Sequence, residues 1–152
     1  MRQADVADEP FLDGLYITTR IEEVLSWGFP PEAARAFLVG QARVQRRAYA
    51  LQFSVAEHNI LLEAGRAVGR LIIAADPPAL RVVDISVLPE IHGRGLGTWA
   101  LEQVLARATR GHAPVRLTTL AAGPARRLYH RLGFQVTAAS EDGLLAMEWL
   151  PE

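Results

Sequence analysis

Apolar residues near the start of the chain recur at helical spacing. They fall at Ile21, Val24 and Leu25, and again at positions 34, 37, 38 and 44. This period predicts two amphipathic helices between residues 20 and 45, and the turn-forming sequence GFPP at residues 28–31 separates them. Upstream, residues 15–19 (LYITT) are β-branched and aromatic and predict a short first strand. Residues 1–10 are polar, and we expect them to be frayed.

From residue 58 onward, short apolar runs alternate with turns. Residues 58–63 and 68–75 predict a hairpin, and residues 80–88 predict a strand that ends at Pro89. Helical spacing returns over residues 96–108 and 124–132, and further strands are predicted at residues 115–120, 134–138 and 144–149. Hairpins around one strand–turn–helix–strand crossover predict an α/β (α+β) fold, with a mixed, mostly antiparallel twisted sheet of about seven strands and helices on both faces.

Length and composition limit the class of protein. A chain of 152 residues that is 50% hydrophobic and 22% charged predicts one globular domain over residues 1–152. The net charge of −1 argues against nucleic acid or an anionic membrane as the main partner. The chain has no cysteine, which excludes disulfides, thiolate zinc sites and a cysteine nucleophile. No signal-peptide pattern or membrane span is apparent, so we expect a cytoplasmic protein.

The most informative segment is VLPEIHGRGLGT at residues 87–98, which joins a predicted strand to a predicted helix. Alternating glycines let a backbone approach a ligand closely, and a helix N-terminus offers free N–H groups to an anion. A tight turn without ligand is the plainer interpretation, but the backbone entropy that each glycine costs favours a phosphate cradle. A P-loop is excluded because the chain contains no lysine. A dinucleotide fingerprint fails because residues 115–120 lack the acid that would bind the ribose.

The same segment resembles the GNAT superfamily of N-acetyltransferases. The family motif V-x-P-x-x-[QR]-x-x-G-x-[GA] has its counterpart in Val87, Pro89, His92, Gly95 and Gly97. Downstream, PARRLYHRLGF at residues 124–134 is similar to the family block N-P-A-x-x-L-Y-x-x-x-G-F. The resemblance extends from about residue 80 to residue 134. It implies acetyl-CoA as co-substrate and a GNAT-like sheet splayed between the fourth and fifth strands.

The resemblance also implies which residues hold the cofactor. Main-chain groups of the fourth strand would pair with the pantetheine arm, and amides of the glycine turn would hold the pyrophosphate. The expected cofactor-binding residues are Ile85, Ser86, Val87, His92, Gly93, Arg94, Gly95, Leu96, Gly97 and Thr98. Arg94 adds a positive charge that suits phosphates. No metal is expected, because the histidines lack a partner at metal-ligand spacing.

Two residues are candidates for the chemistry. Tyr129 matches the general-acid tyrosine of the family, although packing of its helix against the sheet is the alternative. Asp84 lies inside an apolar strand, where a carboxylate needs a purpose or a partner. It is either the general base or a hydrogen-bond acceptor for a neighbouring loop. A base that acts through ordered water needs no particular residue close by.

The acceptor side is less defined. Trp27 and Phe29 are candidate substrate-binding residues in the turn between the first two helices, and aromatic residues there also serve as core. The acceptor is expected to be an amine of a small molecule or peptide, and a homodimer is compatible with the sequence.

Two positions depart from the family: His92 replaces Gln or Arg, and Ala122 and Gly123 stand where an Asn is expected before Pro124. A catalytically weak acyl-CoA-binding module is therefore the second hypothesis.

Overall fold

The computed structural model describes residues 1–152 and contains one seven-stranded sheet. The strand order is β1-β2-β3-β4-β5-β7-β6, and only the β4–β5 pair is parallel. The strands are β1 (Arg2–Gln3), β2 (Glu57–Glu63), β3 (Arg66–Asp76), β4 (Ala79–Val87), β5 (Val115–Leu120), β6 (Gln135–Ala139) and β7 (Leu144–Trp149). The predicted mixed, mostly antiparallel sheet is confirmed, including the number of strands.

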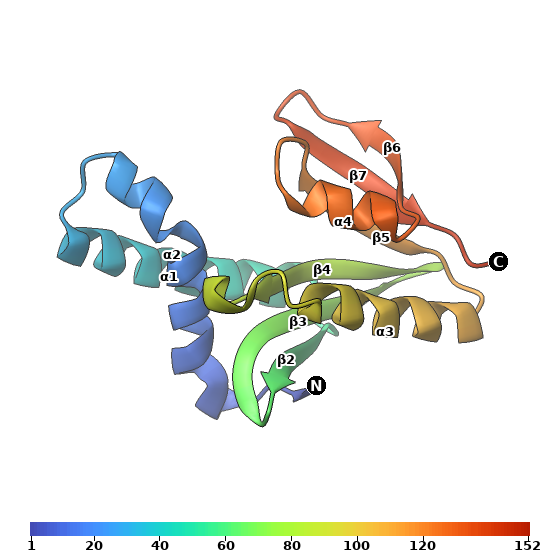
Figure 1. The fold of residues 1–152 in the computed structure, drawn as a ribbon, viewed down its shortest axis with the longest axis horizontal. Helices are drawn as coiled ribbons and strands as arrows, with labels where there is room; N and C mark the ends of the chain where they lie inside the picture. The colour runs from blue at the N-terminus through green and yellow to red at the C-terminus, as the bar shows by residue number, and fades with distance from the viewer.

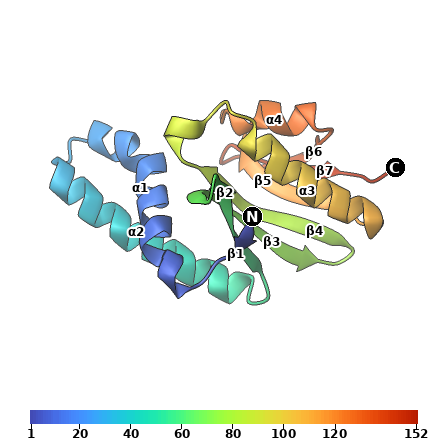
Figure 2. The same cartoon turned by 60° about the horizontal axis from the view of Figure 1, so that its bottom comes forward.

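Four α-helices cover the two faces of this sheet. They are α1 (Glu9–Ser26), α2 (Pro31–Gln52), α3 (Leu96–Arg110) and α4 (Ala125–Arg131). Figures 1 and 2 show α1 and α2 as a helical hairpin on one side of the molecule and α3 and α4 together on the other. The side chains agree: α1 packs Leu15 against Val68, whereas α3 and α4 pack on Leu71, Val82 and Leu117.

The first helix corrects the prediction of a strand at residues 15–19, which lie inside α1. Their β-branched residues favour a strand locally, but the helix places Ile17 and Val24 in a small core with Ala34 and Leu38 of α2. Burial of this shared apolar stripe outweighs the modest local preference. The predicted pair of helices is present, with α1 beginning well before residue 20 and α2 extending beyond residue 45.

The N-terminus is ordered, which contradicts the expectation that residues 1–10 are frayed. Arg2 and Gln3 pair antiparallel with Ile60 and Asn59 of β2. Arg2 also donates to both carboxylate oxygens of the buried Asp8, at 2.8 and 2.7 Å. Arg2, by its hydrogen bonds, is the main cause that lowers the pKa of Asp8 to about 2. A salt bridge across a short turn therefore fastens the chain end to the sheet edge.

The largest core cluster lies between the sheet and the pair α3 and α4. Helix α3 contributes Ala100, Leu101, Val104 and Ala108, all buried. Their spacing matches the predicted helical stripe, and the strand predicted at residues 115–120 is β5. This core fixes α3, and with it the turn that precedes the helix, against β4. No helix of the structure is long and apolar enough to cross a membrane.

Strands β3 and β4 come unusually close at Gly69, which faces Val87. A Cβ atom at Gly69 would lie 2.5 Å from the main-chain oxygen of Ser86 and 3.2 Å from Leu61 Cδ1. The first contact is with backbone and cannot be relieved by rotating a side chain. Gly69 therefore permits the close register at the end of β4, directly before the glycine turn.

We predict that Gly69→Ala lowers the free energy of unfolding by about 1–3 kcal/mol, because β4 must move to accept the methyl group. Gly14→Ala is the matched control, since a Cβ at Gly14 in α1 meets nothing within 4 Å. That change should stabilise the protein by about 0.5–1 kcal/mol. Chemical denaturation measures both. Equal effects of the two substitutions would contradict the close contact.

Candidate active site at the divergence of β4 and β5

The glycine turn follows β4 and leads into α3. After a short 3-10 turn at Pro89–Ile91, Gly93 and Gly95 adopt φ angles of +83° and +80°. Residues with a side chain rarely adopt this left-handed region, so glycine is required at both positions. His92 closes the loop, because its Nε2 lies 2.8 Å from the main-chain oxygen of Val87. The imidazole thus acts within the loop, where a cofactor-binding role was expected.

The main-chain amides of this turn are free. The first hydrogen bond of α3 is donated by the amide of Trp99 to the oxygen of Gly95, at 2.9 Å. The amides of residues 93–98 donate to no protein acceptor. No side chain caps the helix either, so its positive dipole end is open. A row of free N–H groups at a helix N-terminus is a binding site for an anion such as a pyrophosphate.

Two arginine side chains lie at this turn. Arg94 donates to Glu63 at 2.7 Å, and both side chains of the pair are well exposed. Such a pair contributes little stability, so an arriving phosphate can compete for Arg94. Arg131 of α4 approaches the hydroxyl of Thr98, with 3.5 Å between Nη2 and Oγ1. The sequence reasoning missed Arg131, because no local pattern indicates that α4 lies beside the start of α3.

Strands β4 and β5 pair only at their beginnings. Leu80, Arg81 and Val82 face Val115, Arg116 and Leu117, and beyond that point the two strands have no mutual pairing. The predicted splay between the fourth and fifth strands is therefore present. It leaves one main-chain edge of β4, over residues 83–87, without a strand partner.

The register shows which groups on β4 face this open edge. The amide of Leu88 donates to the oxygen of Val68, and Val87 faces Gly69. Because antiparallel residues alternate between bonded and non-bonded pairs, the main chain of Ser86 points to β3. The main-chain groups of Ile85 and Val87 point instead towards β5. Of the three residues predicted to line the cofactor arm, Ile85 thus presents both main-chain groups to the opening, and Val87 presents its amide, since its oxygen is bonded to His92.

Tyr129 of α4 is buried with its ring against Phe134, at 5.7 Å between centroids. Its hydroxyl makes no hydrogen bond, yet the structure has no enclosed side-chain polar atom without a partner. The hydroxyl is therefore the part of Tyr129 that remains open. Burial, and secondly the negative charge of Asp84, raise the pKa of Tyr129 to about 12. The phenol is protonated throughout the physiological pH range.

Asp84 is held in an ion pair with Arg70 of β3. Arg70 Nε donates to Asp84 Oδ2 at 2.6 Å, and the Ser86 hydroxyl donates to the same carboxylate at 3.2 Å. Arg70 also donates to Gln45 of α2 at 2.7 Å. Asp84 thus accepts hydrogen bonds from a donor on the adjacent strand and not from a loop, and its role as general base stays a prediction.

A hollow of about 630 Å³ opens on the α2 face, where β4 and β5 begin to separate. Val82 and Val83 of β4, Thr118 of β5 and Tyr49 of α2 line it. Burial, and then the charge of Asp84, raise the pKa of Tyr49. Asp84 therefore acts on phenols from both helical layers, Tyr49 of α2 and Tyr129 of α4.

Trp27 and Phe29 lie elsewhere. They form an exposed aromatic cluster with Phe37, with ring centroids 5.7–6.3 Å apart. This cluster is at the tip of the α1–α2 hairpin, and both views of the molecule show that tip away from α4 (Figures 1 and 2). The structure does not bring these two residues to Tyr129. It also contains no group of three His, Cys, Asp or Glu side chains placed to hold a metal ion.

A splayed parallel strand pair followed by a turn of free amides defines an acyltransferase-type α/β domain. The family model of the acetyltransferase (GNAT) domain matches residues 50–136, which is more than half of the chain. The chain belongs to the GNAT acetyltransferase family. No curated protein matches it in sequence.

Solved structures of low sequence identity share the fold. An acetyltransferase from Thermus thermophilus has a TM-score of 0.71 and 17% identity, over 98% of this chain and 94% of its own. The PaiA N-acetyltransferase from Thermoplasma acidophilum, solved in complex with coenzyme A, has a TM-score of 0.67 and 13% identity. The match covers 98% of this chain and 96% of that protein. A GNAT family acetyltransferase from Elizabethkingia anophelis with acetyl-CoA bound has a TM-score of 0.59 and 15% identity. The match covers 68% of this chain and 82% of that protein.

We predict that Asp84→Asn lowers the pKa of Tyr129 from about 12, because a negative charge that disfavours the phenolate is removed. The value should stay above the ordinary 10.0, since burial is the larger cause. Titration of ¹³C-labelled tyrosines followed by NMR measures this, with Tyr129→Phe assigning the signal. A Tyr129 pKa near 10 in the unmodified protein would contradict the buried setting.

Proposed function

We propose that the chain transfers the acetyl group of acetyl-CoA to a primary amine of a small molecule or peptide, by direct attack in a ternary complex. The observation that carries this proposal is the continuity of three features. The open edge of β4 leads at its end into the free amides of residues 93–98, and the negative charge of Asp84 on β4 raises the pKa of Tyr129, which supports placing its hydroxyl at the same opening. Family membership supports the choice of reaction.

Acetyl-CoA would bind in an extended form across these features. Its pyrophosphate would accept hydrogen bonds from the amides of the turn, with Arg94 adding charge once it leaves Glu63. Its pantetheine arm would pair with the main chain of Ile85 and the amide of Val87 as a further strand, with the thioester between β4 and β5. The complexes of PaiA with coenzyme A and of the Elizabethkingia enzyme with acetyl-CoA support this choice of ligand.

In the proposed reaction, the lone pair of a neutral amine forms a bond to the thioester carbonyl carbon. The C–S bond then breaks, the nitrogen loses a proton, and CoA leaves as a thiolate. A proton transfer from Tyr129, with a pKa of about 12, to a thiolate with a thiol pKa near 8.5 is uphill by about 5 kcal/mol. We therefore assign Tyr129 as the hydrogen-bond donor that stabilises the departing thiolate, which then takes its proton from water.

The amine would approach from the α2 face, past Tyr49. Asp84 lies on this side of β4 and is the acidic residue proposed to receive the proton of the attacking amine, either through water or after Arg70 shifts. Its ion pair with Arg70 holds the carboxylate in place. Trp27 and Phe29 do not belong to the proposed acceptor site.

A second function is an acyl-CoA-binding module without efficient turnover. Two observations favour it: the Asn expected before Pro124 is absent, and the carboxylate of Asp84 is already engaged by Arg70 and Ser86. Both functions require acetyl-CoA binding, so turnover with an amine separates them.

We also propose that two copies associate through β6. This strand is one of the two edges of the sheet, and all of its residues are exposed. An exposed edge strand offers unpaired main-chain groups to another strand.

We predict that Gly95→Ala weakens acetyl-CoA binding about tenfold, because alanine strains a turn that must hold its left-handed conformation. Gly65→Ala is the matched control. Gly65 has the same φ of +80°, lies in the β2–β3 turn, and likewise would place an added methyl group with nothing within 4 Å. Both variants should lose similar stability, and only Gly95→Ala should lose affinity in calorimetric titration. Equal affinities would count against the turn as the phosphate site.

We predict that Tyr129→Phe lowers kcat about 10²-fold and leaves the Kd for acetyl-CoA unchanged, because the hydroxyl acts on the thiolate that forms only during reaction. Release of free CoA in the presence of a panel of primary amines is the measurement. Tyr16→Phe is the control, since Tyr16 lies in the α1–α2 core. Unchanged release by Tyr129→Phe would refute its role, and binding without any release would favour the second function.

A further inference from the structure

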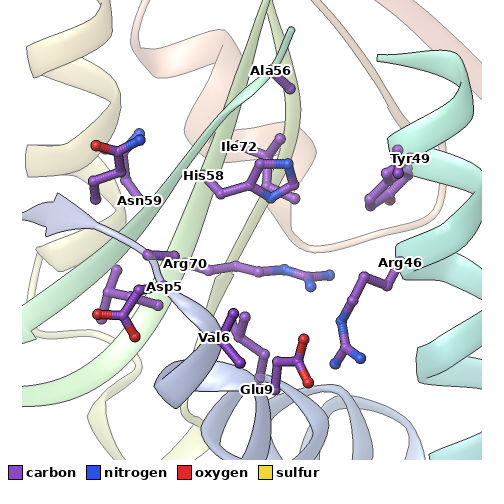
Figure 3. Close-up of a pocket in the computed structure, with 15 residues that line it drawn as sticks. Asp5, Val6, Glu9, Arg46, Tyr49, Ala56, His58, Asn59, Arg70 and Ile72 are labelled. Carbon is purple, nitrogen blue, oxygen red and sulfur yellow. The ribbon is translucent and has the colours of Figure 1, made fainter. Parts of the chain in front are cut away.

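A cavity of about 370 Å³ lies on the α2 face of the sheet, separate from the glycine turn (Figure 3). Its floor includes His58, Arg70 and Ile72 of β2 and β3. The end of α2 forms one wall with Arg46 and Tyr49, and the ordered N-terminal segment forms the other. None of residues 92–98 lines it. The cofactor site therefore does not account for this cavity.

Two guanidinium groups reach into the cavity from different elements. Figure 3 shows Arg70 extending from β3 towards Arg46 of α2. Arg70 donates from Nε to Asp84 and from Nη2 to Gln45 and Asp84. Arg46 donates from Nη2 to Asp13. The Nη1 groups of both arginines and Nε of Arg46 have no protein partner. Arg70 is largely buried, with 14% of its side chain exposed, and it lines the cavity.

The carboxylates around the cavity do not use these donors. Asp13 and Asp84 are already engaged in ion pairs. Asp5 accepts from the amide of Ala7 at 2.8 Å as the cap of the N-terminal turn. Glu9 is exposed at the rim and forms no salt bridge within 4.0 Å. Burial, and then the positive charge of Arg70, lower the pKa of His58, which favours its neutral form. The unused donors suit a planar anion, and a carboxylate matches the fork of a guanidinium.

The cavity lies next to the proposed reaction centre, with Tyr49 between them. Tyr49 lines both this cavity and the hollow at Val82, Val83 and Thr118. Ile72 on the cavity floor faces Asp84 across the β3–β4 ladder, and Arg70 bonds directly to Asp84. A molecule in the cavity that extends past Tyr49 would therefore bring its other end to the point where β4 and β5 separate.

We propose that the acceptor is a primary amine that also carries a carboxylate, with the carboxylate bound by Arg46 and Arg70 and the amine directed to Asp84. This inference rests on the proposed acetyl transfer. Arg46 is a specificity-determining residue in it, and Arg70 links the acceptor's carboxylate to the carboxylate of Asp84.

Matched acceptors that differ only in the carboxylate test the proposal. The pairs are leucine with isopentylamine and 6-aminohexanoate with hexylamine, each offered with acetyl-CoA while free CoA is measured. In at least one pair, kcat/KM should be about tenfold higher for the carboxylate-bearing member. Arg46→Gln should remove that preference by raising KM for the carboxylate-bearing members. Glu9→Gln should increase the preference two- to threefold, because it removes a like charge from the rim.

Arg107→Gln is the control for loss of a paired arginine, since Arg107 of α3 binds Glu57 and lines no part of this cavity. It should leave the preference intact. Turnover without any preference for the carboxylate would overturn the inference and leave the proposed function standing. If Arg46→Gln fails to fold, the test relies on Glu9→Gln, which should increase the preference for the carboxylate-bearing acceptor. An unchanged preference in Glu9→Gln would overturn the inference.

A binding measurement separates this inference from failure of the proposed function. If no amine releases CoA, the products N-acetylleucine and N-isopentylacetamide serve as probes in ligand-observed NMR without cofactor. Tighter binding of N-acetylleucine that Arg46→Gln weakens about tenfold would support the carboxylate site by itself. Equal binding of the two probes would overturn it.

Discussion

Strand β4 pairs with β3 from Ala79 to Val87, interrupted only at Val83, and with β5 only at Leu80, Arg81 and Val82. The rest of the site depends on this unequal pairing. The divergence frees the main chain of Ile85 and the amide of Val87, and β4 then ends in a turn whose amides are unpaired because α3 begins there. The facing edges of β4 and β5 stay apart because each strand is held on its other side. Gly69 permits close pairing of β4 with β3, and β7 pairs with the whole of β5. The opening is thus a consequence of the sheet register and needs no mobile loop.

The charge of Asp84 affects ionisable groups on both sides of this opening. Its charge contributes to the raised pKa values of Tyr129 on the α4 side and Tyr49 on the α2 side, and both phenols therefore remain protonated donors. Arg70 holds the same carboxylate and reaches the cavity beyond it. One strand position thereby couples the proposed cofactor side, the acceptor side and the carboxylate site. All of the positive side chains in the chain are arginines, which suits binding of planar anions.

Much of the fold could be predicted from the sequence, because most elements show their periodicity locally. The strand at residues 115–120 and the stripe of α3 are examples. The conformation of residues 15–19 could not be predicted correctly. Their β-branched side chains favour a strand, but packing against α2 stabilises a helix there. The glycine turn and Tyr129 were accessible through motifs. The partner of Asp84 was not, because only the pairing of β3 with β4 brings Arg70 to it. The position of Trp27 and Phe29 likewise depends on the direction of the helical hairpin.

The central claim is that acetyl-CoA binds along β4 with its pyrophosphate on the turn at residues 93–98. Titration of ¹⁵N-labelled protein with acetyl-CoA tests it most directly, because each amide reports its own surroundings. The account predicts the largest shifts at the amides of residues 93–98, with Ile85 and Val87 next. Shifts confined to the cavity beside Arg46, or to the aromatic cluster at Trp27, would contradict it.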